Sequence, residues 1–201
     1  MQPGSERWDL QPPMSIEEWA ELDEDVEGEW VDGYLVEEEV AGYIHEVVVS
    51  WLTVEVGTWL RKRGGLIGGS TAKFAVSSRR GRMPDLSVYL PQEGKPPGRG
   101  LIRVPPSIMV EVVSARPKDA KRDRVDKLAE YAAFGVRYYW IVDPQTRLIE
   151  IYELGQDQRY VHAAGAAEGA FEPPGCPELV LPLDALWAEV AELEASESEP
   201  G

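Results

Sequence analysis

The stretch IMVEVV at residues 108–113 is an almost unbroken apolar run of strand length that holds a single glutamate. A run of this kind is typical of a central strand that is covered on both faces of a sheet. Because a buried carboxylate is costly unless it is paired or binds a metal ion, Glu111 is also a candidate functional residue. The run therefore predicts a covered sheet and singles out one of its side chains for chemistry.

Further strands and a helix are predicted on both sides of this run. Asp85–Leu90 alternates apolar and polar residues, which is the period of a half-buried strand. Asp119–Phe134 is amphipathic and is followed by a glycine, as helices often are. The remaining patterns predict an extended segment at 66–76, a basic turn at 77–82, a hairpin of strands at 136–143 and 148–154, a strand at 159–163 and a short helix at 182–193.

A short helix, a hairpin and a long helix are predicted in the N-terminal part. The Ser-x-x-Glu pattern at 15–18 is a capping box, which places a short helix there. The Asp-Gly pair at 32–33 tolerates the positive φ that a tight hairpin needs, between strands at 29–31 and 34–36. Apolar residues at three- and four-residue spacing make Tyr43–Arg63 the longest helical candidate.

The order of these elements predicts an α/β chain with a mixed sheet. The long helix and the helix at 119–134 are expected to cover its two faces. A length of 201 residues suits a single domain. We expect that domain over residues 15–187, preceded by a flexible tail at 1–14 and followed by an acidic tail at 188–201.

The formal net charge of −16 is distributed unevenly along the chain. Residues 1–39 carry a net −13 and residues 188–201 a net −5, whereas residues 59–127 carry a net +10. A basic middle permits a polyanionic partner. Our hypothesis is that the acidic ends repel such a partner or cover the basic surface in its place. One cysteine and two histidines exclude disulfides and a Cys/His zinc site. The acidic start and the lack of a long apolar run lead us to expect a cytoplasmic protein without membrane contact.

Asp85 and Lys127 join Glu111 as candidates for chemistry. Two acids on adjacent strands, such as Asp85 and Glu111, would suit a hard cation like Mg²⁺, which takes oxygen ligands. Taken singly, each of the two acids is also consistent with a carboxylate that accepts main-chain N–H bonds or pairs with an arginine. Lys127 alone is also consistent with an exposed helix pair with Asp123. The three residues together indicate a function more specifically than any one of them alone.

In combination these residues resemble the PD-(D/E)XK nuclease superfamily and, more narrowly, the Uma-two family of bacterial endonucleases. The matching motifs occur in order over about residues 15–187. They are Glu29–Gly33, His45, Met83-Pro84-Asp85, Glu111–Ser114, Asp123–Lys127, Tyr131 and Gly135–Asp143. The resemblance implies a restriction-endonuclease-like fold, in which helices flank a mixed sheet after an N-terminal helix and hairpin.

One position departs from the superfamily pattern. A lysine stands there two residues after the second acid, whereas this chain has Val113. In the resembling family the role of that lysine passes to the following helix, where Lys127 is the matching position. The resemblance therefore predicts that the Lys127 ammonium reaches the polar face of the strand that carries Glu111.

The activity implied by the resemblance is metal-dependent hydrolysis of nucleic-acid phosphodiester bonds by an endonuclease. Asp85 and Glu111, with the main-chain carbonyl of Val112, would hold one or two Mg²⁺ or Mn²⁺ ions. Lys127 would steady the attacking water or the phosphate oxygens.

Glu29 and His45 are second-rank members of the implied site. Glu29 would offer a further oxygen to the metal, and His45 would orient a water molecule or a ligand carboxylate. The expected partner is nucleic acid, in the first place DNA, and a homodimer is expected because two strands suit a two-fold assembly. Basic groups at 79–82 and 118–124 adjoin the motifs and are expected to contact phosphates.

Two other functions fit part of the pattern. A catalytically silent nuclease-fold protein would bind nucleic acid or a protein partner without cutting. A two-carboxylate glycosidase would use Asp85 and Glu111 without a lysine or a metal ion, but the neighbouring basic clusters disfavour it. Joint binding of a divalent ion by the two acids distinguishes the three functions.

Overall fold

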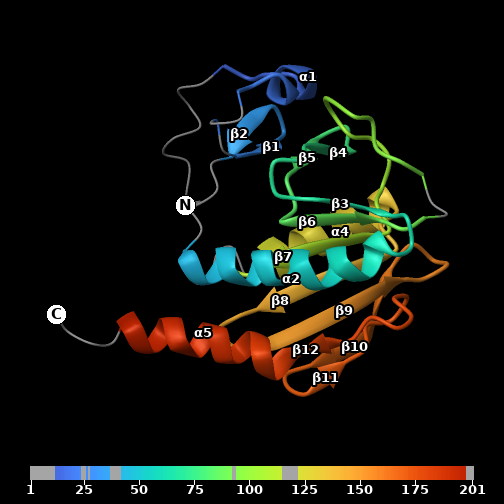
Figure 1. Ribbon diagram of the computed structural model, residues 1–201. Coiled ribbons are helices and arrows are strands. Elements are labelled where there is room, and N and C mark those ends of the chain that lie inside the picture. Colours follow the sequence, from blue (N-terminus) through green and yellow to red (C-terminus); the bar gives the residue numbers. More distant parts are fainter. Residues whose placement is uncertain are drawn as a thin grey trace.

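A six-stranded mixed sheet forms the centre of the computed structural model, which describes residues 12–23, 26, 28–36, 42–91, 94–114 and 122–197 (Figure 1). Its strands, in the order β10-β9-β8-β7-β6-β3, are β3 (Leu66–Gly68), β6 (Leu86–Tyr89), β7 (Ile108–Val112), β8 (Tyr138–Asp143), β9 (Leu148–Leu154) and β10 (Tyr160–Ala166). β7 and β8 are parallel, whereas β3–β6, β6–β7, β8–β9 and β9–β10 are antiparallel pairs. The predicted mixed sheet is confirmed, and the IMVEVV run supplies one of its two central strands.

Helices cover both faces of this sheet, as the sequence predicts (Figure 1). They are α2 (Tyr43–Arg61) with α5 (Leu183–Glu197) beside it on one face, and α4 (Leu128–Phe134) on the other. Side chains of β7 alternate between these layers. Val110 packs in the cluster that contains Leu52 of α2, and Met109 packs in the cluster that contains Tyr131 of α4. Glu111 lies two residues after Met109 and therefore points to the α4 side.

A smaller, four-stranded sheet contains the N-terminal hairpin (Figure 1). In the order β2-β1-β5-β4 its strands are β2 (Tyr34–Val36), β1 (Glu29–Val31), β5 (Arg80–Arg82) and β4 (Phe74–Ser77), and α1 (Ile16–Ala20) packs on it. The predicted Asp-Gly turn is present, with φ of 54° at Asp32 and 97° at Gly33. The basic turn predicted at 77–82 is wrong for its last three residues. They form β5, because β1 and β4 on either side pair with their backbone.

Gly81 of β5 is a point of close packing between the small sheet and α1. A Cβ atom there would lie 2.5 Å from the ring of Trp19, a fully buried residue. We expect Gly81→Ala to lower the free energy of unfolding by about 1–3 kcal/mol, because overpacking forces the ring or the strand to shift. Urea unfolding measures this, with Gly98→Ala as the control, since nothing lies within 4 Å of a Cβ atom at Gly98. Equal losses in the two variants would contradict the packing argument.

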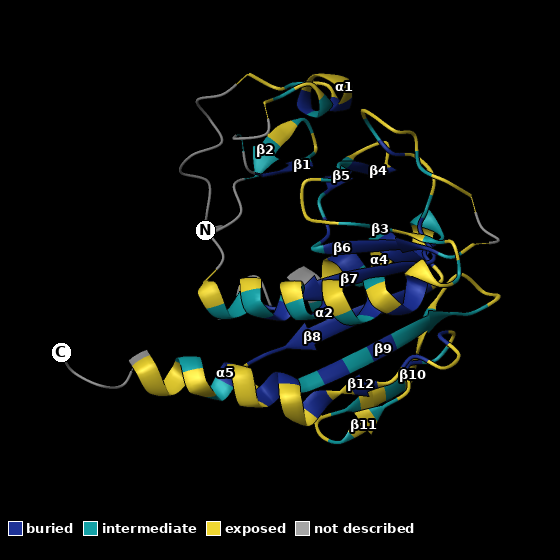
Figure 2. Cartoon of the chain, in the orientation of Figure 1, coloured by how far each residue is buried: buried dark blue, intermediate teal, exposed yellow. Residues whose placement is uncertain are grey.

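The extent of several elements differs from the predictions because of packing. β6 is buried along its whole length rather than half-buried, since helices cover both faces of the sheet (Figure 2). α5 continues to Glu197, past the predicted end at residue 193, and Val190 is buried in the core. The acidic segment after residue 187 is thus helical as far as Glu197, while the domain limits stay a prediction. Two short paired strands were not predicted, β11 (Ala170–Phe171) and β12 (Leu181–Pro182).

The helix expected at 119–134 has an unusual beginning. Residues 119–121 lie outside the described residues, and the next six form a π-helix, η2 (Arg122–Lys127), that runs directly into α4. Short π-helical segments are uncommon and often occur at functional sites. The extended segment expected at 66–76 is divided between β3 and β4, which belong to different sheets.

Candidate active site

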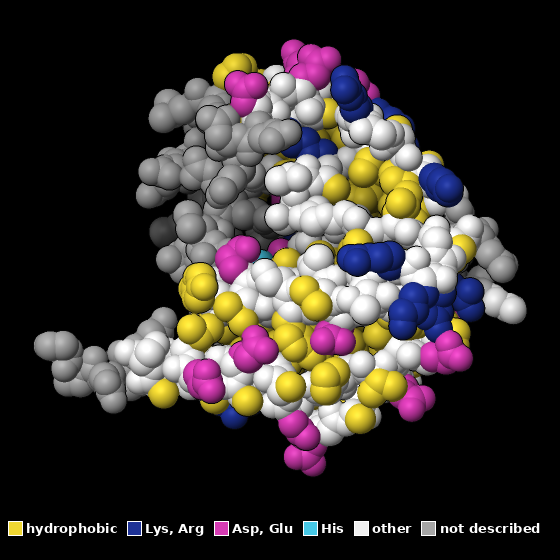
Figure 3. All heavy atoms as spheres, in the orientation of Figure 1, with side chains coloured by type: hydrophobic (Ala, Val, Ile, Leu, Met, Phe, Trp, Pro, Cys, Tyr) yellow, Lys and Arg dark blue, Asp and Glu magenta, His cyan; other side chains and the backbone are white. Residues whose placement is uncertain are grey.

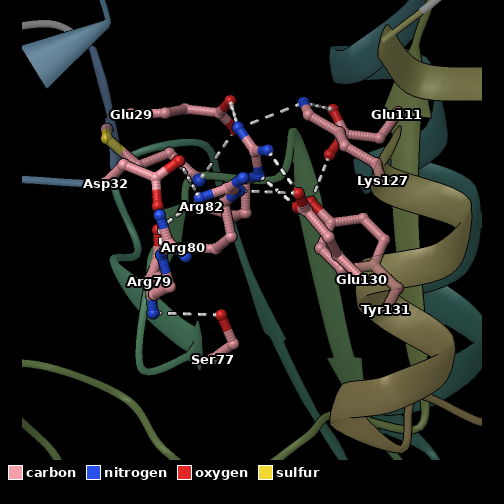
Figure 4. A network of polar contacts seen from close by, with 11 residues as sticks. Glu29, Asp32, Ser77, Arg79, Arg80, Arg82, Glu111, Lys127, Glu130 and Tyr131 are labelled. Carbon is pink, nitrogen blue, oxygen red and sulfur yellow. Dashed lines mark hydrogen bonds and ion pairs between the residues drawn. The ribbon is translucent and has the colours of Figure 1, made fainter. Parts of the chain in front are cut away.

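Lys127 stands at the end of η2 and extends toward β7 (Figure 4). Its Nζ atom lies 2.9 Å from Oε2 of Glu111, and only 2% of the Lys127 side chain is exposed. The reach that the family resemblance implied for Lys127 is therefore present. A buried lysine placed against a buried glutamate satisfies both charges at a point where neither would be stable alone.

Tyr131 follows Lys127 by one helical turn and contacts the same carboxylate. Its hydroxyl donates to Oε1 of Glu111 over 2.6 Å. Burial, followed by the negative charge of Glu111, raises the pKa of Tyr131 well above its usual range, so the hydroxyl keeps its proton and remains a donor. One oxygen of Glu111 thus faces an ammonium and the other a hydroxyl.

Glu29 brings the small sheet into the same cluster. It begins β1, its side chain is fully buried, and its Oε1 atom lies 3.3 Å from Nζ of Lys127. Its Oε2 atom pairs with Arg82 of β5, and the main-chain N–H of Met83 donates to Oε1 over 3.4 Å. Lys127 therefore lies between two carboxylates that come from different sheets (Figure 4).

His45 and Asp85 form a second group at the end of β7. Nε2 of His45, in the first turn of α2, lies 3.2 Å from Oδ2 of Asp85, and the same oxygen accepts the main-chain N–H of Val112 over 2.7 Å. Among the described residues, Oδ1 of Asp85 has no hydrogen-bond partner. Burial disfavours a charged imidazole, but the hydrogen bond and charge of Asp85, with a smaller effect of Glu46, outweigh it and raise the pKa of His45.

The five predicted site residues thus fall into two neighbouring groups. Glu29, Glu111 and Lys127 are in contact, and His45 contacts Asp85, which is bonded to the backbone beside Glu111. Within the ranges that the structure describes, no cluster of three or more His, Cys, Asp or Glu side chains is placed to hold a metal ion. The carboxylates of Asp85 and Glu111 are oxygen ligands of the kind that Mg²⁺ and Mn²⁺ prefer.

Arg82 and Glu130 extend the first group in a way that the sequence did not predict. Nε and Nη2 of Arg82 donate to the two oxygens of Glu130 over 2.6 and 2.8 Å, in addition to the pair with Glu29. Burial opposes the charge of Arg82, but the bond to Glu130 and the charges of both glutamates outweigh it and raise its pKa. The expected phosphate contact is therefore wrong for Arg82, which acidic partners enclose. Lys127, Glu130 and Tyr131 lie on the same side of a helix by their three- and four-residue spacing. This spacing was the sequence signal that pointed to the network.

Other basic residues near the motifs are also paired with acids. Arg79 and Arg80 both pair with Asp32 in the β1–β2 turn, and Arg124 pairs with acids of β8 and β9. Residues 118–121 of the second basic cluster lie outside the described residues. Arg79, Arg80, Arg82 and Arg124 are thus each paired with protein carboxylates.

The face of the molecule in Figure 3 carries an acidic and apolar groove along α2 and α5. Its volume is about 520 Å³, and it is lined by Tyr43, Glu46, Val47, Ser50, Trp51, Val54, Glu55 and Glu189. Lysine and arginine side chains gather instead near the C-terminal end of α2, where Arg61 and Lys62 are exposed. Neither the groove nor this basic end contains any of the five predicted site residues.

A family model described as "Putative restriction endonuclease" matches residues 15–184. The chain belongs to this family, Uma-two. The solved structure of "a putative nuclease belonging to DUF820" from Anabaena variabilis ATCC 29413 aligns with a TM-score of 0.70 and 16% identity, over 89% of this chain and 99% of that one. The fold that the resemblance implied for this Uma-two protein is therefore confirmed.

Further comparisons add little to the family and the fold. The type IIG restriction endonuclease BpuSI aligns with a TM-score of 0.40 and 13% identity, over 82% of this chain and 19% of that one, which is too low to support an argument. A search of curated proteins found no match. In the described part of this Uma-two protein, no helix has both the length and the apolar character to cross a membrane.

Proposed function

We propose that this Uma-two protein is a metal-dependent endonuclease that hydrolyses phosphodiester bonds in nucleic acid. The observation that carries the proposal is the 2.9 Å contact between Nζ of Lys127 and Oε2 of Glu111. A helix thereby supplies the cation that Val113 cannot supply from the strand. Membership of a family described as "Putative restriction endonuclease" supports the same function.

Asp85 and Glu111 would hold the metal ion, with the main-chain carbonyl of Val112 as a further ligand. Oδ1 of Asp85, which has no partner among the described residues, and the carboxylate of Glu111 offer oxygen ligands of the kind that Mg²⁺ and Mn²⁺ bind. When bound, such an ion lowers the pKa of a coordinated water and neutralises charge on a phosphate. The chain prepares the site by holding Glu111 between Lys127 and Tyr131, which fixes the direction of its carboxylate.

Lys127 would stabilise the negative charge that develops on the phosphate. A positioned ammonium acts strongly on such charge where little water competes with it. Glu29 holds this ammonium on the side away from Glu111 (Figure 4), and His45 holds the carboxylate of Asp85. We therefore assign Glu29 and His45 supporting roles in the same site.

We further propose DNA as the substrate, a homodimer as the active form and the cytoplasm as the location. The net charge of +10 over residues 59–127 supports a polyanionic substrate. A two-fold assembly suits the cutting of two strands. The domain that carries this activity is proposed to span residues 15–187.

Titration with Mn²⁺ tests the metal site before any substrate is chosen. A ligand that binds only the native state stabilises it by about 2.7 kcal/mol at 100 times its Kd, so the melting temperature should rise with Mn²⁺. We expect this rise to be lost in Asp85→Asn and in Glu111→Gln. It should persist in the exposed control variants Asp157→Asn and Glu189→Gln. A rise that survives both site variants would contradict a shared metal site.

A second function, binding without cutting, is favoured by the burial of the site. Glu29 is fully buried, Lys127 is almost so, and two carboxylates already compensate the lysine charge. A substrate phosphate would reach that ammonium only after a covering element moves. Wild-type protein that binds DNA but shows neither stabilisation by Mn²⁺ nor cleavage would establish this second function.

A further inference from the structure

Arg82 is a buried cation that the proposed hydrolysis does not use directly. It stands at the end of β5 with 3% of its side chain exposed. Nη1 pairs with Glu29, while Nε and Nη2 donate to the two oxygens of Glu130 (Figure 4). Because three nitrogen atoms are engaged by two acids, the guanidinium contacts no substrate in this arrangement.

Both partners of Arg82 lead to Lys127. Glu29 gives one oxygen to Arg82 and the other to Nζ of Lys127, so the guanidinium sets the rotation of a carboxylate that touches the ammonium. Glu130 lies one helical turn after Lys127, and a two-point bond of this kind has a defined direction as well as strength. Arg82 therefore holds both the acidic partner of Lys127 and the helix that carries it.

Arg80 does not replace these contacts. It bonds to Glu130 through a single nitrogen at 3.1 Å and to Asp32 at 2.7 Å, and 28% of its side chain is exposed. Its described contacts do not include Glu29. The geometry around Lys127 thus depends on Arg82 in particular.

We propose that Arg82 is a positioning residue of the proposed active site. It places the Lys127 ammonium beside Glu111 by holding Glu29 and Glu130. The inference rests on the proposed function, in which that ammonium is the cation of hydrolysis. Glu29 then acts through the ammonium, and Arg82 acts through Glu29 and the helix.

Arg82→Lys tests this assignment, because lysine keeps the charge but lacks the planar fork that binds a carboxylate at two points. We expect kcat for plasmid cleavage with Mg²⁺ to fall about 10- to 100-fold, the range typical for loss of a residue that orients site ligands. KM and the affinity for Mn²⁺ should stay within about twofold, since Arg82 bonds to none of the three proposed metal ligands. Arg63→Lys is the matched control, because Arg63 also bonds to several acceptors but lies beyond the far end of α2.

The Lys127 ammonium provides a readout that does not depend on activity. Proton–nitrogen correlation spectra detect lysine ammonium groups that exchange slowly, and Lys127→Met identifies the signal of Lys127. We expect that signal to shift or broaden in Arg82→Lys and in Glu130→Gln, and to stay unchanged in Arg63→Lys. Glu130 is partly exposed, so Glu130→Gln keeps the test valid if Arg82→Lys does not fold.

Two results would overturn the proposal. One is an unchanged Lys127 signal in both variants. The other is a fall in kcat accompanied by an equal loss of Mn²⁺ affinity, since general loosening of the fold would lower both. If the wild type cuts no nucleic acid, the proposed function fails, and the Lys127 signal still decides whether Arg82 positions this ammonium.

Discussion

Replacing Lys127 with methionine is expected to lower the rate of DNA cleavage about 10²- to 10³-fold, the usual loss when one group that stabilises transition-state charge is removed. Methionine keeps the length and the apolar part of the side chain but removes the ammonium that lies 2.9 Å from Glu111. The position two residues after Glu111, where the superfamily pattern has its lysine, is occupied by Val113 and therefore supplies no cation in place of Lys127. Single-turnover cleavage of a plasmid at saturating Mg²⁺ measures the change in the chemical step.

Two further variants make this result specific. Lys62→Met removes an exposed lysine just beyond α2 and is expected to cut at the wild-type rate. Lys127→Arg keeps the charge but introduces a larger, planar group into a buried place, so we expect an intermediate rate. If folded Lys127→Met cuts as fast as the wild type, Lys127 is not the third member of the site.

Arg82→Met is expected to lower the free energy of unfolding by about 3–5 kcal/mol, the usual cost of leaving a buried ion pair without one partner. Glu29 is fully buried and loses its contact with Arg82, and Glu130 loses a two-point bond. Since single domains are stable by only about 5–15 kcal/mol, this loss removes a large part of the total. The midpoint of urea unfolding at neutral pH measures it.

Arg103→Met is the matched control for that measurement. Arg103 also pairs with a glutamate, Glu17, at 2.6 Å, but both side chains are more than half exposed. An exposed pair contributes only about 0–1 kcal/mol, so the control should unfold close to the wild type. Adding Glu29→Gln to Arg82→Met should recover part of the loss, because without Arg82 the buried carboxylates of Glu29 and Glu111 share Lys127 as their cation. Equal losses for Arg82→Met and Arg103→Met would show that burial does not strengthen the network.

Elements with a local signal could be predicted from the sequence. The capping box forms as expected, with the N–H of Glu18 donating to Oγ of Ser15 over 3.1 Å. The Asp-Gly turn adopts positive φ at both residues. Residues 108–112 of the IMVEVV run form a buried central strand, which is the environment that a short run rich in valine and isoleucine favours. Each of these signals lies within a few neighbouring residues.

Elements that depend on distant partners were predicted less well. Arg80–Arg82 has the composition of an exposed turn, but it is a strand because β1 and β4 pair with it on both sides. The acidic segment after residue 187 continues as a helix because Val190 packs into the main core. A local sequence pattern does not predict which strand a segment will pair with or which core it will pack into.

The sequence by itself determined the fold class, the two acids of the candidate site and, through the family resemblance, the helix lysine that faces them. Only the tertiary structure decided which of these groups touch. Tyr131 and Glu111 are 20 residues apart, and Arg82 and Glu29 are 53 residues apart, yet each pair is in contact inside the protein. The sequence does not distinguish a charged side chain that is exposed to water from one that is buried beside a charged partner. Its role follows from strand pairing and burial, which the whole chain sets together.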